Sequence, residues 1–335
     1  MDPLSQGTVG AAFAQSVANK NNIAKISVVG FLAGLAPDLD VLIRSSTDPI
    51  LFLEYHRQFT HSLFFIPFGA LIVSTLIFPL VRKSLSFKTT YMASFLGYAT
   101  HGILDACTSY GTLLFWPFSN ERITWNNISI VDPLLTIPAL VLLALAVKTG
   151  KRRFSFFAMS WIVSYLALGF VQYERALSSA LKLAQSRGHS AERMTLKPSF
   201  GNLILWKSIY QHEDSFYVDA IRAGRELTWC LGESIKIFDD QYHLPDLDRN
   251  SQQRKNIERF RWFSQDYLGF DDDKNLVTDV RYSMVPNQIA PMWGLVIDER
   301  RGINEHAVWW TSRDLDDESL TSFNEMLFGD KCTAK

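Results

Sequence analysis

Residues 62–81 read SLFFIPFGALIVSTLIFPLV and contain no charged side chain. A membrane-spanning helix needs about 20 consecutive, mostly apolar residues, so this stretch predicts a transmembrane helix. Residues 154–173, FSFFAMSWIVSYLALGFVQY, are also uncharged and predict a second one. Together the two stretches indicate an integral membrane protein whose first half is built from helices.

Weaker apolar stretches extend the predicted membrane bundle. Three of them are apolar apart from one or two ionisable residues, namely 26–43, 89–115 and 129–147. A fourth, 4–18, is short and rich in glycine and alanine, which suits close packing between helices. The sequence therefore predicts an all-α membrane bundle of five or six spans.

Basic loops predict the orientation of this bundle. Lysine and arginine residues gather between the first and second, the third and fourth, and the fifth and sixth spans: Lys20, Lys25, Arg82, Lys83, Lys88, Lys148, Lys151, Arg152 and Arg153. In a six-span arrangement all three loops lie on one side, and loops rich in positive charge stay in the cytoplasm. Both ends of the chain are then expected outside, which is the periplasm in a bacterium with an outer membrane.

The chain changes character after about residue 188, where the helix that follows the last span is expected to end. Of the 34 acidic residues in the 335-residue chain, 25 lie from residue 190 onward. We therefore expect a membrane domain at 1–177 and a small water-soluble domain at 190–335. Strand-like and helix-like patterns predict an α+β fold with a mostly antiparallel sheet: strands at 203–210, 216–222, 277–285, 294–298 and 307–311, and a helix at 256–268.

Composition and cysteine spacing exclude other classes of site. The net charge is −1 and the chain has no basic run or aromatic RNA-binding motif, so no nucleic-acid partner is expected. The three cysteines lack metal-ligand spacing, but Cys230 and Cys332 can pair if their domain lies outside the cytoplasm. The N-terminus shows no pattern of a cleaved signal peptide.

Ionisable residues in the predicted bundle share one kind of chemistry. Charged groups in a bilayer are costly and usually functional. They form the motifs P-D-L-D, H-R-Q-F-T-H-S, T-H-G-I-L-D and V-D-P, which contain Asp38, Asp40, His56, Arg57, His61, His101, Asp105 and Asp132. His101 and Asp105 are four residues apart, so they share one face of a helix. Asp38, Asp40, His61 and Asp132 map to the outer halves of their spans, and Asp105 lies beyond the midpoint of its span, nearer the outer end. This agreement predicts a metal site at the outer face.

Imidazole and carboxylate ligands suit a divalent metal. We expect one or two ions, zinc first with manganese or iron as alternatives, bound by Asp38, Asp40, His56, His61, His101 and Asp105. Two ions would stabilise the attacking and leaving oxygens of an in-line displacement. Arg57 and Asp132 are the candidate catalytic residues, and Arg57 is suited to bind an anionic oxygen such as that of a phosphate.

Simpler interpretations exist for single residues. P-D-L-D is also a plausible helix end. Arg57 can simply neutralise Asp38 or Asp40, and a single buried histidine can be a packing residue. A chance gathering of three histidines and four aspartates on one face is much less expected. The four histidines of the second half have no ligand-like neighbours and are interpreted as ordinary residues: His189, His212, His243 and His306.

The order of the motifs resembles a known family. D-P-L-S-Q-G, G-L-A-P-D-L-D, Y-H-R-Q-F-T-H-S, G-Y-A-T-H-G-I-L-D, T-S-Y-G-T, W-P-F-S and I-V-D-P-L resemble the YdjM-type bacterial inner-membrane proteins over residues 1–150. These proteins are described as predicted metal-dependent hydrolases, and the resemblance implies the ligand set given above. Many relatives carry histidine where this chain has Gln6; if that histidine is a ligand, the contact is weaker or missing here. The H-x-x-x-D element is also similar to that of zinc-dependent phospholipase C, which favours phosphoester chemistry.

These observations favour a membrane-bound, metal-dependent hydrolase at the outer face of the bacterial inner membrane. Its expected substrate is a phosphoester of a lipid or lipid-linked molecule, and membrane lipids are its expected partners. The alternative is a non-catalytic envelope protein with a structural metal, which a closed coordination shell would favour. A transporter or proton pathway is disfavoured because the inner halves of the spans carry almost no polar residues.

Overall fold

The computed structural model describes residues 1–313, 316–329 and 332–334. Contacts divide the chain into two compact units. The first, here called the helical unit, consists of Met1–Ile43, Tyr55–Val171 and Phe200–Asn202. The second, here called the sheet unit, consists of Arg44–Glu54, Gln172–Ser199 and Leu203–Lys335.

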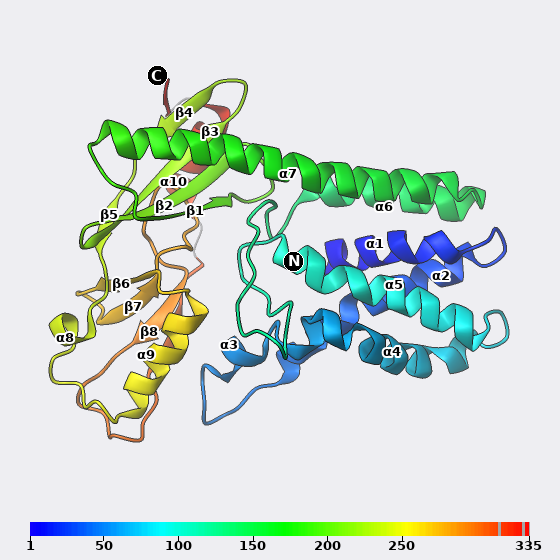
Figure 1. The fold of residues 1–335 in the computed structure, drawn as a ribbon, viewed down its shortest axis with the longest axis horizontal. Coiled ribbons are helices and arrows are strands. Elements are labelled where there is room, and N and C mark those ends of the chain that lie inside the picture. Colours follow the sequence, from blue (N-terminus) through cyan, green and yellow to red (C-terminus); the bar gives the residue numbers. More distant parts are fainter. Residues whose placement is uncertain (314–315, 330–331, 335) are drawn as a thin grey trace. The chain divides into compact units, whose positions relative to one another are not determined.

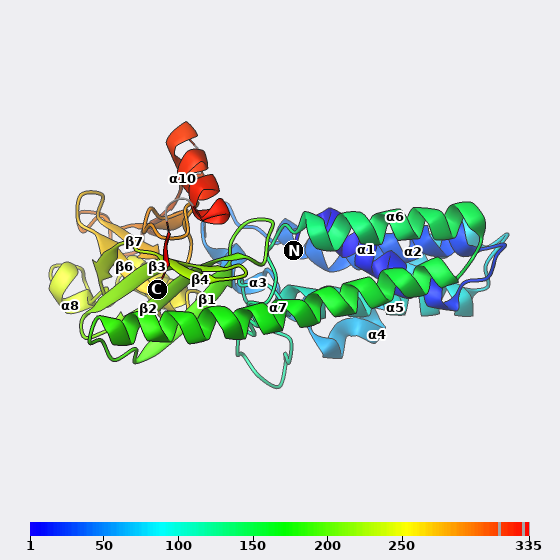
Figure 2. The same cartoon turned by 90° about the horizontal axis from the view of Figure 1, so that it is seen from above.

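The helical unit is a bundle whose helices run along a common direction (Figure 1). Figures 1 and 2 both show α1 and α2 side by side within it. Its helices are α1 (Pro3–Ala14), α2 (Ile23–Leu35), α4 (Ile66–Val81), α5 (Phe87–Ala106), α6 (Pro133–Thr149) and the first part of α7 (Arg153–Ser186). The predicted helical continuation beyond the last span is confirmed, because α7 extends to Ser186.

Polar caps determine where these helices begin. The Asp2 carboxylate accepts the Ser5 backbone N–H at 3.0 Å ahead of α1, and Asp132 accepts that of Leu135 at 3.2 Å ahead of α6. A proline follows each aspartate, and it fits the first turn because the missing N–H has no helical partner there. Ser86 caps α5 in the same manner.

Small residues let α1, α2 and α5 approach along their backbones. A Cβ atom at Gly97 would lie 2.5 Å from the carbonyl oxygen of Gly30, and one at Gly30 would lie 2.8 Å from that of Gly10. No larger residue fits at such a distance, so glycine permits the close packing. The prediction that the N-terminal glycine- and alanine-rich stretch packs inside the bundle is confirmed.

Two helical segments in the described part of the chain are long and apolar enough to cross a membrane, Leu63–Val81 and Arg153–Ser186. They coincide with the two uncharged stretches of the sequence. Helix α6 is apolar but has 17 residues, while α1 and α2 have 12 and 13. At 1.5 Å per residue the latter two are roughly 18–20 Å long, shorter than the ~30 Å hydrocarbon core of a bilayer. The helical fold is confirmed, whereas a total of five or six spans stays a prediction.

The sheet unit, within the described residues, holds two antiparallel sheets. The first contains β1 (Arg193–Pro198), β2 (Leu205–His212), β3 (Ser215–Ala223), β4 (Leu227–Cys230), β5 (Ser234–Lys236) and β10 (Thr333–Ala334). The second contains β6 (Leu268–Asp271), β7 (Leu276–Asp279), β8 (Trp293–Val296) and β9 (Val308–Thr311). Its helices are α3 (Leu51–Tyr55), α8 (Asp240–His243), α9 (Gln252–Phe263) and α10 (Asp317–Phe328). The predicted α+β class with antiparallel sheet is confirmed.

Two predicted boundaries in this unit are wrong. The strand predicted at 277–285 ends at Asp279, because the buried Arg281 turns back and donates to the Asp279 carboxylate at 2.7 Å. The helix predicted at 256–268 ends at Phe263. Gln265 and Asp266 have φ angles of 52° and 59°, a left-handed conformation that no α-helix can contain.

Two buried lysines tie the first sheet to the segment that follows Asp279. Lys207 Nζ donates to Ser283 Oγ at 2.8 Å and to the Gln288 carbonyl oxygen at 2.7 Å. Lys197 Nζ donates to the Arg281 carbonyl oxygen at 2.9 Å. Burial lowers the pKa of Lys207 to about 7 and the pKa of Lys197 well below its ordinary value. A neutral amine still donates two hydrogens, which matches the two acceptors of Lys207.

The stability of the sheet unit is expected to rise with pH between about 7 and the ordinary lysine pKa of 10.5. In this range the unfolded chain keeps the Lys207 proton and the folded chain releases it, so each such group adds up to about 1.4 kcal/mol per pH unit to the free energy of unfolding. Lys207→Met should reduce this slope in urea titrations followed by tryptophan fluorescence. The exposed Lys255→Met is the control, and a slope unchanged by Lys207→Met would contradict the prediction.

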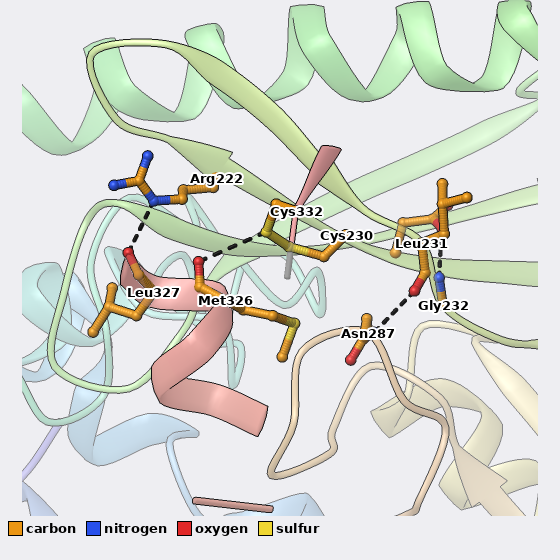
Figure 3. Close-up of a disulfide and its surroundings, with 9 residues drawn as sticks. Arg222, Cys230, Leu231, Gly232, Asn287, Met326, Leu327 and Cys332 are labelled. Atoms are coloured by element: carbon orange, nitrogen blue, oxygen red, sulfur yellow. Dashed lines mark hydrogen bonds between the residues drawn. A yellow bond between two sulfur atoms is a disulfide. The ribbon is translucent and has the colours of Figure 1, made fainter. Parts of the chain in front are cut away.

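A disulfide joins Cys230 at the end of β4 to Cys332 (Figure 3). The two Cα atoms lie 4.4 Å apart, and 102 residues separate the cysteines in the sequence. Next to it, Arg222 Nε donates to the Leu327 carbonyl oxygen at 2.9 Å, which attaches the end of α10 to β3. The sequence left open whether Cys230 and Cys332 pair, and in the structure they form a disulfide.

Candidate metal centre

Two histidines and two aspartates bring their ligand atoms together in the helical unit. Asp38 lies in the 3-10 segment that follows α2, His61 in the 3-10 segment before α4, and His101 and Asp105 on α5. One ligand atom from each lies within 4.8 Å of the others. The histidines and Asp105 are buried, whereas the Asp38 side chain is 25% exposed. Four of the predicted ligands thus share one site.

Four of the five distances within this first group are close to those of one tetrahedral ion, and the separation of the two imidazole Nε2 atoms is shorter. The Nε2 atoms of His61 and His101 are 2.9 Å apart. Asp38 Oδ1 lies 3.4 and 3.3 Å from these two nitrogens, and Asp105 Oδ2 lies 3.2 and 3.4 Å from them. Ligands placed about 2.0–2.2 Å from a tetrahedral zinc ion lie roughly 3.3–3.6 Å from one another. Four protein atoms therefore outline a coordination shell.

Hydrogen-bond partners decide which nitrogen of each ring faces the centre. His101 Nδ1 lies 2.5 Å from the Gly34 carbonyl oxygen, which can only accept, so Nδ1 carries the hydrogen. His61 Nδ1 faces Asp40 Oδ2 at 3.2 Å and Thr60 Oγ1 at 3.0 Å. Both Nε2 lone pairs then face the same point, where they repel unless a cation or a proton lies between them. Such partners are typical of metal-ligating histidines.

Asp105 is held through one oxygen and presents the other to the centre. Its Oδ1 accepts a hydrogen bond from Gln6 Nε2 at 2.9 Å and contacts the Met1 amino group. Its Oδ2 is buried and accepts no hydrogen bond from the residues that the structure describes. A buried carboxylate oxygen without a donor is costly unless a cation satisfies it. The Arg57 guanidinium supplies one cation, with its Nε 3.2 Å from this oxygen, and the remaining lone pair of the oxygen fits a divalent metal.

A second group shares Asp38 with the first. Asp38, Asp40 and His56 each place one ligand atom within 4.8 Å of the others. His56 Nδ1 lies 2.8 Å from Asp40 Oδ1, while Asp40 Oδ2 accepts the Arg57 backbone N–H at 3.0 Å and the Thr60 hydroxyl at 2.8 Å. Burial lowers the pKa of His56, and this effect outweighs the hydrogen bond with Asp40, which raises it. The lowered pKa favours the neutral imidazole, the form that binds a metal. A carboxylate common to both groups is able to bridge two ions.

Arg57 lies beside the first group. Its Nε is 3.2 Å from Asp105 Oδ2, its Nη1 donates to Thr108 Oγ1 at 3.0 Å, and its guanidinium lies over the Tyr110 ring at 4.8 Å. The ion partner of its side chain is Asp105, whereas the sequence suggested one of the P-D-L-D carboxylates. Its φ angle of 65° is unusual for a residue other than glycine. The predicted role in binding an anionic oxygen stays a prediction.

Gln6 lies where many members of the resembled family carry a histidine. Its side chain is fully buried, and its amide donates to Asp105 Oδ1. Gln6 therefore orients a ligand residue through a hydrogen bond. Whether metal binding is weaker than with a histidine there stays a prediction.

Neither ligand group includes Asp132. This residue caps α6 and accepts the Tyr165 hydroxyl hydrogen bond, with distances of 2.9 and 3.0 Å to its two oxygens. Its catalytic role stays a prediction. In the described part of the sheet unit no histidine belongs to a metal-binding group of three or more ligand residues; His189 and His212 instead stack at 4.2 Å.

Sequence reasoning missed the groups that orient the ligands. Thr108 follows the T-H-G-I-L-D motif, and a hydroxyl next to such a motif is a weak signal. Thr60 lies inside H-R-Q-F-T-H-S, between the two histidines of the motif, and its hydroxyl donates to Asp40. The carbonyl of Gly34 gives no sequence signal, because every residue carries one.

Gly102→Ala is expected to weaken zinc binding by roughly 10- to 100-fold, the range typical for lost ligand orientation. A Cβ atom there would lie 2.0 Å from the His61 carbonyl oxygen. Because this neighbour is backbone, the His61 segment must shift and its Nε2 must leave the centre. Chelator competition on detergent-purified protein measures the affinity. Ile103→Ala, on an exposed face of α5, is the control, and equal affinity in the glycine variant would contradict the prediction.

Comparison with known proteins places this centre in a family. The chain is 24% identical over 250 residues to a Bacillus subtilis (strain 168) protein described as uncharacterized protein YfhP, covering 73% of this chain and 72% of that protein. No solved structure matches the chain. The family model described as YdjM inner membrane protein matches residues 1–176, which contain both ligand groups and Gln6. As the order of its motifs predicted, the chain belongs to the YdjM inner membrane protein family.

Proposed function

We propose that the protein is a metal-dependent hydrolase that cleaves a phosphoester of a lipid or lipid-linked substrate at the outer face of the inner membrane. The observation that carries the proposal is that four ligand atoms, one of them a buried carboxylate oxygen of Asp105, lie within 4.8 Å of one another. A family of inner-membrane proteins supports the location in the membrane.

The residues divide into ligands and groups that orient them. Asp38, His61, His101 and Asp105 would hold one ion, and two imidazoles favour zinc over harder metals. Such an ion supplies Lewis-acid activation of water and of a phosphoryl oxygen. Gly34 keeps the His101 ring in the ligand tautomer.

Arg57 would recognise the anionic part of the substrate. Its guanidinium already neutralises Asp105 at 3.2 Å and lies on the Tyr110 ring. Arginine has five N–H donors in a planar fork, so a contact to one carboxylate leaves donors for a phosphate oxygen.

Two independent features support an outward-facing centre and a sheet unit outside the cytoplasm. The basic loops between the predicted spans lie on the side opposite to the ligand motifs, and such loops stay in the cytoplasm. The disulfide between Cys230 and Cys332 belongs to an oxidising compartment. A centre at headgroup depth suits a phosphoester whose tail stays in the bilayer.

The proposal is tested with protein reconstituted into phospholipid vesicles that contain phosphatidic acid or a polyprenyl monophosphate, two phosphomonoesters. Phosphate release should require added zinc or manganese, stop with a chelator and resume when the metal is restored. If the protein retains its metal but releases phosphate from neither probe, the proposed phosphoester hydrolysis is contradicted.

A structural metal in a non-catalytic envelope protein is the second candidate. It is favoured by the first group itself, because four protein ligands close a tetrahedral shell and leave no position for water. The 25% exposure of Asp38 and its place in both groups favour an open centre instead. Cobalt-substituted protein separates the two, since only an open centre changes its visible spectrum when phosphate is added.

A further inference from the structure

The segment between two predicted ligands belongs to the sheet unit. Asp40 and His56 lie in the helical unit and contact each other at 2.8 Å. Residues Arg44–Glu54, which connect them, pack instead with the sheet unit. The chain therefore leaves the helical unit after one ligand and returns just before the next.

Arg259 of α9 binds two acidic residues of this segment, Asp48 in its middle and Glu54 at its end. Its Nη1 and Nη2 contact the two oxygens of Asp48 at 3.1 and 2.9 Å, and its Nε donates to Glu54 Oε1. The three side chains are between 19% and 33% exposed, so water screens this network only in part. The paired contact to Asp48 needs the planar fork of an arginine, which lysine cannot replace.

Apolar and aromatic contacts add to this attachment. The Phe52 ring meets the Trp309 ring of β9 edge-on at 5.2 Å, and Phe260, next to Arg259 on α9, meets the same ring at 5.9 Å. Ile50 and Leu53 of the segment are buried. The segment is thus fixed by both a helix and a strand of the sheet unit.

Fixing the segment reduces the freedom of the ligands that follow and precede it. A flexible connection must lose conformational entropy each time its ends are brought together. Glu54 is two residues from His56, and Asp48 is eight from Asp40. Anchoring at Asp48 and Glu54 therefore restricts the connection before a metal binds.

We propose that Arg259 is a positioning residue of the sheet unit that sets the metal affinity of the Asp38–Asp40–His56 group. This inference rests on the proposed function, because it assigns an ion to that group. It gives the sheet unit a role. An event that frees Arg259 from Asp48 and Glu54 would weaken the ion of this group more than the ion of the first group, which has two of its four ligands on α5.

The test compares wild-type protein with Arg259→Ala in zinc titrations by chelator competition and calorimetry. Wild type should bind two ions. The variant should bind the second ion roughly 10- to 100-fold more weakly, as for other lost ligand-orienting contacts, with a smaller change in the first ion, which has two of its four ligands on α5. Arg261→Ala is the control, since Arg261 lies on the same helix and pairs with Asp240 and Asp266. General unfolding would weaken both ions together and would contradict the inference.

A second variant keeps the test independent of α9. Asp48→Asn removes the negative charge that pairs with Arg259 and leaves α9 unchanged. It should therefore weaken the ion of the Asp38–Asp40–His56 group as well. If both variants bind two ions with the affinities of wild type, the inference about Arg259 is overturned, but the proposed hydrolase function is not. A wild-type protein that binds one ion overturns the inference alone, and one that binds none overturns both.

Discussion

His101→Ala is expected to leave detergent-purified protein without bound metal in the first group, whereas wild type should contain about one or two equivalents of zinc, manganese or iron. The ring supplies one of four ligand atoms, and its Nε2 lies within 3.4 Å of the ligand atoms of Asp38, His61 and Asp105. Removing it leaves three ligands and a cavity in a buried site. Elemental mass spectrometry on matched samples measures the loss.

The control replaces a histidine outside both ligand groups. His212→Ala removes a ring that stacks on His189 in the sheet unit, so it should retain the wild-type metal content. Circular dichroism should show that His101→Ala keeps its helices, because α5 has further contacts along α1, α2 and α4. Full metal content in the folded variant would mean that the first group is not the metal centre.

Cys332→Ser is expected to lower the free energy of unfolding of the sheet unit by about 4 kcal/mol, since the bond closes a loop of roughly 100 residues. The disulfide holds Cys332 and the following β10 against β4, where β10 pairs with Trp229 and Thr228. Urea titration of the full chain in detergent, followed by tryptophan fluorescence, measures the loss.

Reductant provides the internal control for this prediction. Reduced wild type should match Cys332→Ser, and the variant itself should not respond. In intact cells, thiol reagents should label Cys230 and Cys332 only after reduction, because an oxidising compartment keeps them paired. Free thiols in cells would contradict a sheet unit outside the cytoplasm.

The sequence predicted most of the candidate ligands that the structure brings together, because metal ligands have few substitutes. Histidine and aspartate inside apolar stretches stand out against their surroundings, and the i, i+4 spacing of His101 and Asp105 already placed them on one face. The class of the second half was also readable, because strand patterns and an acidic composition are local properties. Boundaries at Asp279 and Phe263 were not, since they depend on a buried arginine and on left-handed residues.

By itself the sequence determined the helical first half, the antiparallel second half, and which side chains are candidate metal ligands, because periodicity and residue type act locally. Only the tertiary structure decided that four ligands face one point and that Asp38 belongs to two groups. It also decided that Arg57 pairs with Asp105 and that the segment between Asp40 and His56 packs with the sheet unit. These features join residues far apart in the chain through backbone carbonyls, single hydrogen bonds and ion pairs, and no local pattern encodes them.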